Sequence, residues 1–99
     1  MIAEPVLELV VVDGRPTVRG ECDLSGAAKI ELWLLSFDGQ LVEVDLSGVT
    51  FFDSTALRAL LNVRRKKPTF HIVEPSRAVR RVLEITGTLE FLAKPEAAG

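Results

Sequence analysis

The sequence is short of the residues from which metal centres, disulfides and many hydrolase sites are built. It contains one cysteine and one histidine in 99 residues. A single cysteine excludes an internal disulfide and is typical of a reducing compartment such as the cytoplasm. One histidine and one cysteine are also too few for an ordinary structural zinc site. We therefore expect neither a metal nor a cofactor.

An excess of charge and a long hydrophobic run are also missing. The 12 basic and 14 acidic residues give a formal charge of -2, which does not indicate a nucleic-acid binder. The longest apolar-rich run, Ile30 to Phe37, is interrupted by Glu31 and Ser36 and is too short to cross a bilayer. Met1 to Pro5 do not resemble the start of a signal peptide. We expect a soluble cytoplasmic domain with no nucleic-acid partner and no membrane insertion.

The common catalytic motifs are absent from the sequence. It contains no glycine-rich phosphate loop followed by Lys-Ser/Thr, no Gly-x-Gly-x-x-Gly and no pair of histidines one helical turn apart. Ser54, His71 and an aspartate are the available components of a hydrolase triad. His71, however, lies within an apolar strand pattern rather than at a loop tip, where a general base would meet the serine. We interpret it as a packed or surface-facing strand residue and predict that the protein is not an enzyme.

Strand and helix patterns alternate along the chain, which is typical of an α/β fold. The hydrophobic content of 47% supports a single domain, expected over residues 1–93, with a short tail over 94–99. Asp13-Gly14 between two extended runs predicts a hairpin. We expect a mixed, mostly parallel sheet of four to five strands with three to four packing helices. The expected strands cover 6–12, 15–20, 41–46 and 69–73, and the expected helices cover 26–37, 54–65 and the stretch between Ser76 and Gly87. Thr88 to Leu92 fit either a short strand or a helical turn.

Apolar spacing and capping residues define the expected helices more closely. Ser25 is the candidate N-cap of the first helix, and Asp38-Gly39 the candidate stop. Cationic side chains are expected in solvent at two places, Arg64 to Lys67 and the outer face of the third helix. The apolar side chains expected to point inward are Ile30, Leu34, Phe37, Leu57, Leu60, Leu61, Val79, Val82 and Leu83, and those expected to be solvated on the third helix are Arg77, Arg80 and Arg81.

Two apolar residues near the first helix leave alternatives open. Trp33 is either a packing residue or a contact for a partner or a second copy, because this helix is apolar on more than one side. Cys22 is either a small buried side chain or a redox-sensitive thiol. Packing is the favoured interpretation for both residues.

The segment from Asp45 to Arg58 is the most informative part of the chain. An apolar strand leads through a short loop to Asp53-Ser54-Thr55, where a helix is expected to begin. These residue types cap helices, because a side-chain oxygen can accept an unpaired backbone N–H. A phosphate on a serine there would be tolerated by the helix dipole and the free N–H groups. Local chemistry therefore allows either a structural cap or a phosphoacceptor.

Two motifs in the chain are Val44-Asp45-Leu46-Ser47-Gly48-Val49-Thr50-Phe51-Phe52-Asp53-Ser54-Thr55-Ala56-Leu57 and Gly20-Glu21-Cys22-Asp23. Both resemble the STAS domain family, which includes the bacterial anti-sigma-factor antagonists. The order of the expected elements and the chain length agree as well. The family usually has glycine where this chain has Ala56, and alanine is the better helix former.

The resemblance implies a switched binding protein. A partner anti-sigma factor with serine kinase activity would phosphorylate Ser54, or as second choice Thr55, and a separate phosphatase would reverse the modification. The unmodified form would bind the anti-sigma factor and release the sigma factor. The residues expected on the partner-binding surface are Glu21, Asp23, Ser25, Asp53, Ser54, Thr55 and Arg58. The alternative is a STAS scaffold without a switch, or an accessory subunit of a lipid transporter. A homodimer is compatible with either.

Overall fold

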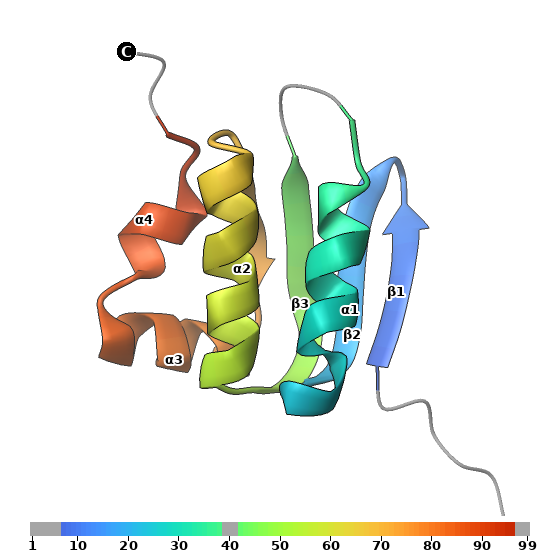
Figure 1. Cartoon of the computed structure of the whole chain (residues 1–99). Helices are drawn as coiled ribbons and strands as arrows, with labels where there is room; N and C mark the ends of the chain where they lie inside the picture. Colours follow the sequence, from blue (N-terminus) through green and yellow to red (C-terminus); the bar gives the residue numbers. More distant parts are fainter. Residues whose placement is uncertain (1–6, 39–41, 97–99) are drawn as a thin grey trace, which may run out of the picture.

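A computed structural model describes residues 7–38 and 42–96 of the chain. Strands and helices follow one another as the sequence predicts, and the final element is helical (Figure 1). The elements are β1 (Leu7–Val12), β2 (Arg15–Cys22), α1 (Leu24–Leu35), β3 (Glu43–Phe52), α2 (Ser54–Lys66), β4 (His71–Pro75), α3 (Arg77–Thr86) and α4 (Leu89–Ala93). Thr88 to Leu92 therefore belong to a helical turn rather than to a fifth strand.

The sheet in the described part of the chain has four strands in the order β1-β2-β3-β4. β1 and β2 are antiparallel, and the other two pairs are parallel, which confirms the mixed sheet. Asp13 and Gly14 join β1 to β2, and both have positive φ angles, 52° and 77°. Positive φ at both central positions is characteristic of a type I′ turn, whose twist matches that of a hairpin. The predicted Asp-Gly hairpin is confirmed.

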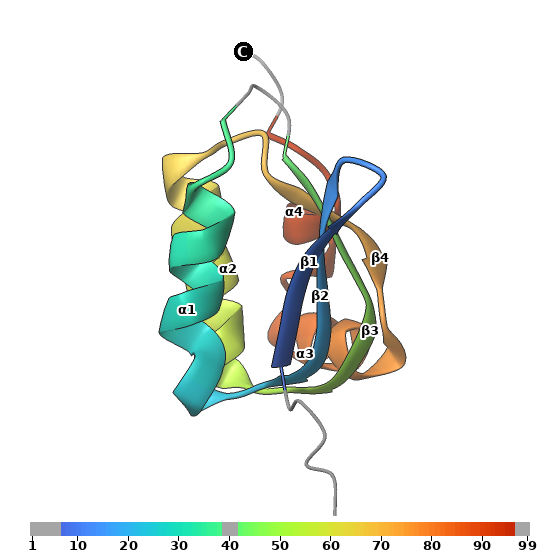
Figure 2. The ribbon, with the colours of Figure 1, turned by 90° about the vertical axis from the view of Figure 1, so that its right-hand side faces the viewer.

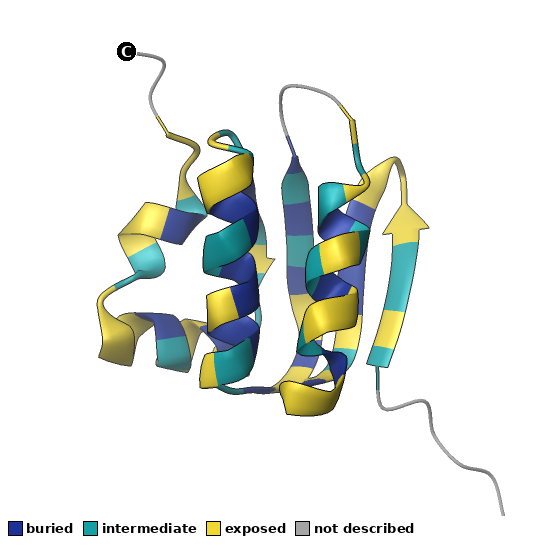
Figure 3. Ribbon diagram, in the orientation of Figure 1, coloured by how far each residue is buried: buried dark blue, intermediate teal, exposed yellow. Residues whose placement is uncertain are grey.

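The helices gather on one face of the sheet. Figure 2 shows α1 and α2 together on one side of the strands, with α3 and α4 next to the β4 edge. The inward faces of helices and strands meet in one core, which includes Val18, Ile30, Leu34, Leu60, Phe70 and Leu83. The buried stripes of α1 and α2 are visible in Figure 3 as dark bands turned toward the sheet. Leu61, Val82 and Phe37 are only half-buried, although they pack against this core.

β3 is longer than the sequence predicts. The pattern indicates a strand ending at Leu46 and a loop over 47–53, but β3 continues to Phe52. Ser47-Gly48 lies at a register irregularity between β2 and β3 instead of ending the strand. A Cβ on Gly48 would stand 2.8 Å from Cγ of Arg19, so the glycine leaves room for the arginine side chain on the neighbouring strand. The predicted start of this strand at Leu41 lies outside the described residues.

α1 begins and ends earlier than predicted. Its N-cap is Asp23 rather than Ser25, because the Asp23 carboxylate accepts the backbone N–H of Ser25 at 3.0 Å. The helix ends at Leu35, with Ser36 as the C-cap, so Phe37 lies beyond it. Gly39, the predicted stop, lies outside the described residues. Ile30 and Leu34 are buried as expected.

The prediction that the cations at the end of α2 lie in solvent is wrong for Arg64. Its residue exposure is only 5%, and its guanidinium donates to the carbonyls of Phe70 at 3.2 Å and Phe91 at 2.6 Å. The guanidinium carbon also lies 4.3 Å from the centre of the Phe91 ring. Lys67 is half-buried and donates to the carbonyl of Phe37 at 2.6 Å. These cations therefore join α2 to distant segments, whereas Arg65 and Lys66 are exposed.

Candidate functional site

Two helix N-termini lie side by side at one end of the sheet. β2 and β3 are parallel, and Cys22 is the register partner of Phe52 at their carboxyl ends. The Asp53 N–H donates to the Cys22 carbonyl at 3.2 Å, which holds the two strand ends together. α1 and α2 start directly afterwards, at the same end of the molecule (Figure 1). The positive dipole ends of both helices are therefore close to one another.

Asp53 is the N-cap of α2. Its carboxylate accepts the backbone N–H groups of Thr55 at 3.0 Å and Ala56 at 3.1 Å, together with the Thr55 hydroxyl. Burial acts to raise the pKa of Asp53, but hydrogen bonds from the Thr55 hydroxyl and the two backbone N–H groups outweigh it and lower the pKa. Asp53 is therefore a charged capping residue that fixes the start of the helix.

Ser54 follows the cap and occupies the first position of α2. It is exposed, and its hydroxyl has no hydrogen-bond partner among the described residues. The capping role that the sequence left open among Asp53, Ser54 and Thr55 belongs to Asp53. Thr55 differs from Ser54, because it is half-buried and its hydroxyl is bound to Asp53. The Ser54 hydroxyl is thus the more accessible of the two.

A groove runs between α1 and α2, from their first turns to Glu31 and Asn62. Its volume is about 530 Å³, and Ser54, Thr55 and Arg58 line it from α2. α1 contributes Leu24, Ala27, Ala28 and Glu31, and the small alanine side chains leave the space between the helices open. The side chain of Leu24 is 75% exposed. The groove therefore combines hydroxyls, a cation and apolar surface.

The other predicted partner-binding residues surround this end of the molecule without lining the groove. Glu21 is exposed at the end of β2. Asp23 is half-buried and accepts the exposed Ser25 hydroxyl at 2.7 Å. The sequence analysis missed Leu24, although an apolar residue directly after an N-cap was a usable signal. It also missed Glu31, which accepts a hydrogen bond from Asn62 at 3.2 Å, because that contact joins residues on different helices.

Cys22 is a buried residue beneath the two helix starts. It is 1% exposed, and burial raises the pKa of its thiol to about 12, with further contributions from the negative charges of Asp23 and Asp53. A thiol nucleophile must be deprotonated and accessible. The buried, packed interpretation of Cys22 is confirmed, and the redox-sensitive alternative is not supported. Trp33 is half-buried, with its ring 5.0 Å from that of Phe37 in an edge-on contact.

His71 lies at the opposite end of β3 from Ser54. It is paired with Glu43, the first residue of β3, whereas Ser54 lies two residues beyond Phe52, the last residue of that ten-residue strand. At about 3.3 Å per residue, the strand separates them by roughly 30 Å. No hydrolase triad can therefore form from Ser54 and His71 within this chain. His71 is a buried strand residue, as one of its predicted interpretations stated.

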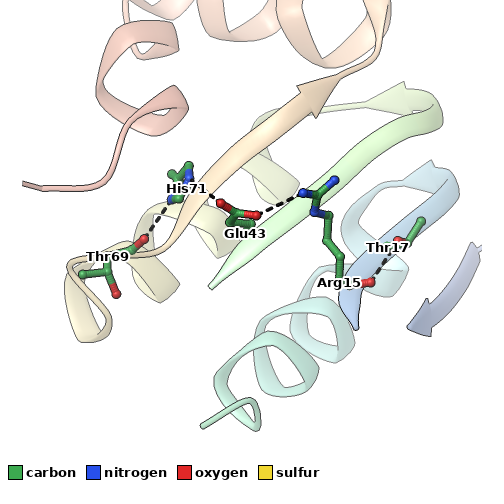
Figure 4. Close-up of polar contacts among 5 residues, drawn as sticks. All are labelled: Arg15, Thr17, Glu43, Thr69 and His71. Carbon is green, nitrogen blue, oxygen red and sulfur yellow. Dashed lines mark hydrogen bonds and ion pairs between the residues drawn. The ribbon is translucent and has the colours of Figure 1, made fainter. Parts of the chain in front are cut away.

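His71 belongs instead to a row of polar contacts that crosses β4, β3 and β2 (Figure 4). Its Nδ1 lies 2.9 Å from the Thr69 carbonyl, which can only accept, so Nδ1 carries a proton. Its Nε2 lies 3.7 Å from Oε2 of Glu43, whose Oε1 accepts from Arg15 at 3.1 Å. Within the described ranges, the acidic, histidine and cysteine side chains form no cluster suited to a metal ion. None of the described helices has the length and apolarity required to cross a membrane.

Comparison with known proteins gives two matches of note. The family model described as "Mlab, STAS domain" matches residues 10–93. The crystal structure of an anti-sigma factor antagonist from Mycobacterium paratuberculosis has a TM-score of 0.68 and 26% sequence identity. The match covers 87% of this chain and 80% of that one. No curated protein sequence matches this chain significantly.

Proposed function

The chain belongs to the STAS domain family, and we propose that it is an anti-sigma-factor antagonist. In this role it binds an anti-sigma factor in the cytoplasm and thereby releases the sigma factor, without catalysing a reaction itself. The similarity to the mycobacterial antagonist supports the binding role. The observation that carries the switch is the exposed Ser54 hydroxyl, which is left unpartnered in the described residues because Asp53 caps the helix.

Phosphorylation of Ser54 would act on binding more than on the fold. A phosphoserine adds about -1.5 to -2 charge and three acceptor oxygens. The positive dipole end at the start of α2 favours such an anion, while the Thr55 and Ala56 N–H groups stay bound to Asp53. The hydrogen bonds made by Asp53 do not involve the Ser54 side chain, so the cap remains in place. The new charge instead stands at the mouth of the groove, where it opposes a docked protein.

The proposed docking surface consists of the groove between α1 and α2 and the polar residues around its end. Arg58 lies one turn after Ser54, exposed and without a hydrogen bond or ion pair in the described chain. Glu21, Asp23 and Ser25 extend the surface along the start of α1. A partner carrying serine kinase activity would reach Ser54 directly, and a separate phosphatase would restore the unmodified form. Thr55 is the second choice of acceptor, because its hydroxyl must first leave Asp53.

The test is phosphorylation by the cognate anti-sigma factor. The purified protein and its Ser54→Ala and Thr55→Val variants are incubated with the kinase and ATP, and phosphate is located by mass spectrometry. The proposal expects modification of the wild type at Ser54, no incorporation in Ser54→Ala and undiminished incorporation in Thr55→Val. Modification of Ser54→Ala to the same extent as the wild type contradicts it.

A second candidate is favoured by the description of the matching family model, "Mlab, STAS domain". Members of the STAS family also act as scaffolds without a switch and as accessory subunits of lipid transporters. In that case Ser54 is a docking contact only. A pull-down from cell extract with Ser54→Ala and Ser54→Asp separates the two. Equal capture of one partner by both variants favours the accessory subunit, and capture by Ser54→Ala alone favours the antagonist.

A further inference from the structure

A second groove lies next to the junction of β3 with α2, on the side away from α1. It has a volume of about 500 Å³ and is formed where the end of β3 meets α3. Phe51, Phe52, Ala78 and Val82 provide apolar lining, and Arg77 and Arg81 provide two cations. α3 and the junction of β3 with α2 lie at the same end of the molecule in Figures 1 and 2.

Phe51 is unusual in leaving about half of its side chain in solvent. Its exposure is 49%, whereas that of the neighbouring Phe52 is 6%. Val82 in the same groove is half-buried. Ile85, one turn after Arg81 on α3, is 76% exposed and continues the apolar surface beyond the groove. An aromatic ring exposed inside a concavity is an anchor for an apolar side chain.

The two arginines of the groove have no counter-charge in the described chain. Arg77 and Arg81 are exposed, and neither makes an ion pair or hydrogen bond there. They are one turn apart on the same side of α3, so their charges repel each other in the free protein. Arg80 differs, because it does not line this groove and its guanidinium lies 4.0 Å from the Glu84 carboxylate. A chain with a formal charge of -2 thus presents an uncompensated positive site here.

We propose that this groove binds a short acidic segment of a partner protein, with one large apolar side chain against Phe51 and carboxylates on Arg77 and Arg81. The planar guanidinium matches a carboxylate in geometry as well as in charge. The apolar lining beside the two cations fits a segment that carries both a large apolar side chain and carboxylates. Phe52, which lines the groove, lies two residues before Ser54, so a protein docked at Ser54 can reach it. The proposal does not require the Ser54 switch.

A synthetic peptide supplies the test. Acetyl-Glu-Glu-Phe-Glu-Glu-amide is titrated into the unmodified, 15N-labelled full chain, and the amide shifts of residues 49–52 and 77–82 are followed. We expect saturable shifts in both segments, with affinity reduced about fivefold or more in Arg77→Gln/Arg81→Gln and also reduced in Phe51→Thr. Arg80→Gln, the matched control on the same helix, binds like the wild type. The charge-inverted peptide, with lysine in place of glutamate, produces no saturable shift.

Several outcomes overturn the proposal. Absence of shifts in these two segments at millimolar peptide excludes the site, and an equal loss in Arg80→Gln shows non-specific charge attraction. Arginine-dependent binding to phosphatidylglycerol vesicles without peptide binding identifies a lipid surface instead. Self-association that Phe51→Thr abolishes identifies a second copy as the occupant. The titration involves neither kinase nor phosphate, so its failure does not bear on the Ser54 proposal. Equally, a failure of Ser54 phosphorylation does not bear on this groove.

Discussion

The Asp53 carboxylate accepts the backbone N–H of Thr55 at 3.0 Å and also accepts the Thr55 hydroxyl. Together with the N–H of Ala56, these bonds satisfy the start of α2 without involving the residue between them. Ser54 is consequently held at a fixed position on an ordered helix while its own hydroxyl faces solvent. Asp53 therefore caps the helix, while the Ser54 hydroxyl remains accessible for modification.

The Asp53 cap leads to a prediction about stability and pH. Asp53→Ala should lower the free energy of unfolding by about 1 kcal/mol at pH 6, because the start of α2 loses its acceptor. The folded pKa of Asp53 is lowered, so the stability its charge contributes is complete above the unfolded pKa of about 3.9 and is lost as pH falls through the folded pKa. The difference between wild type and variant should therefore narrow below about pH 4. Urea denaturation from pH 6 to pH 2.5 measures it.

Asp38→Ala is the control for that series. Asp38 is exposed and makes no hydrogen bond or ion pair in the described part of the chain. Its replacement should change the free energy of unfolding by no more than about 0.5 kcal/mol at any pH in the range. A constant deficit of Asp53→Ala across the whole range would contradict a charged cap.

The hydrogen bond from Arg64 to Phe91 leads to a prediction about how α4 is held against α2. Arg64→Met retains most of the apolar stem but leaves the Phe70 and Phe91 carbonyls without their donor. We expect a loss of about 2–3 kcal/mol, since hydrogen bonds from charged groups contribute about 1.5–3 kcal/mol each and the new side chain recovers part of the contact. Arg65→Met on the exposed face should cost less than about 0.5 kcal/mol. Thermal and urea unfolding measure the stability of the two variants. Equal stability of Arg64→Met and Arg65→Met would show that the hydrogen bonds from Arg64 to Phe70 and Phe91 do not stabilise the fold.

Replacing Ala56 by the glycine that is usual in the family should change both stability and the rate of phosphorylation. Ala56 is 1% exposed in the first turn of α2. Ala56→Gly should cost about 1–2 kcal/mol, from lower helix propensity and loss of a buried methyl group. The initial rate of Ser54 phosphorylation by the cognate kinase should be equal or higher, because the methyl group is gone. A slower rate in a fully folded variant would show that the alanine assists the kinase.

The burial of Cys22 leads to a prediction about the reactivity of its thiol. With burial raising its pKa to about 12, the thiol should react with a disulfide reagent at pH 8 at least about a hundredfold more slowly in the native protein than in urea. Reaction is followed by the absorbance of the released chromophore. Similar rates in the two conditions would place Cys22 at the surface.

Several parts of the fold that depend on local signals could be predicted from the sequence, although the N-cap of α1 is Asp23 and not the predicted Ser25. The Asp13-Gly14 turn needs only its two residues, and the Asp53 cap acts on residues two and three positions away. The end of β3 could not be predicted in this way. Ser47 and Gly48 favour a turn locally, yet pairing with β2 keeps the strand extended and the glycine makes room for Arg19. Tertiary pairing outweighed the local preference.

Asp53 and Ser54 in the candidate site could be predicted from the sequence, but the grooves beside them could not. Ser54 and Asp53 belong to a contiguous motif, so spacing alone placed them together. The groove beside them requires α1 and α2 to be adjacent, and the second groove requires α3 to meet the end of β3. Arg64 was missed for the same reason, because its acceptor Phe91 lies 27 positions away. Contacts of this kind depend on packing and leave no periodic signal in the sequence.

The most direct test of the switch is a calorimetric titration of the cognate anti-sigma factor with two forms of this protein, unmodified and phosphorylated at Ser54. A complete switch from bound to free requires about 5.5 kcal/mol, a change in Kd of about ten-thousandfold. We predict a loss of affinity approaching that size, with an unchanged circular dichroism spectrum and melting transition. Equal affinity of the two forms, or unfolding of the phosphorylated one, would contradict the account.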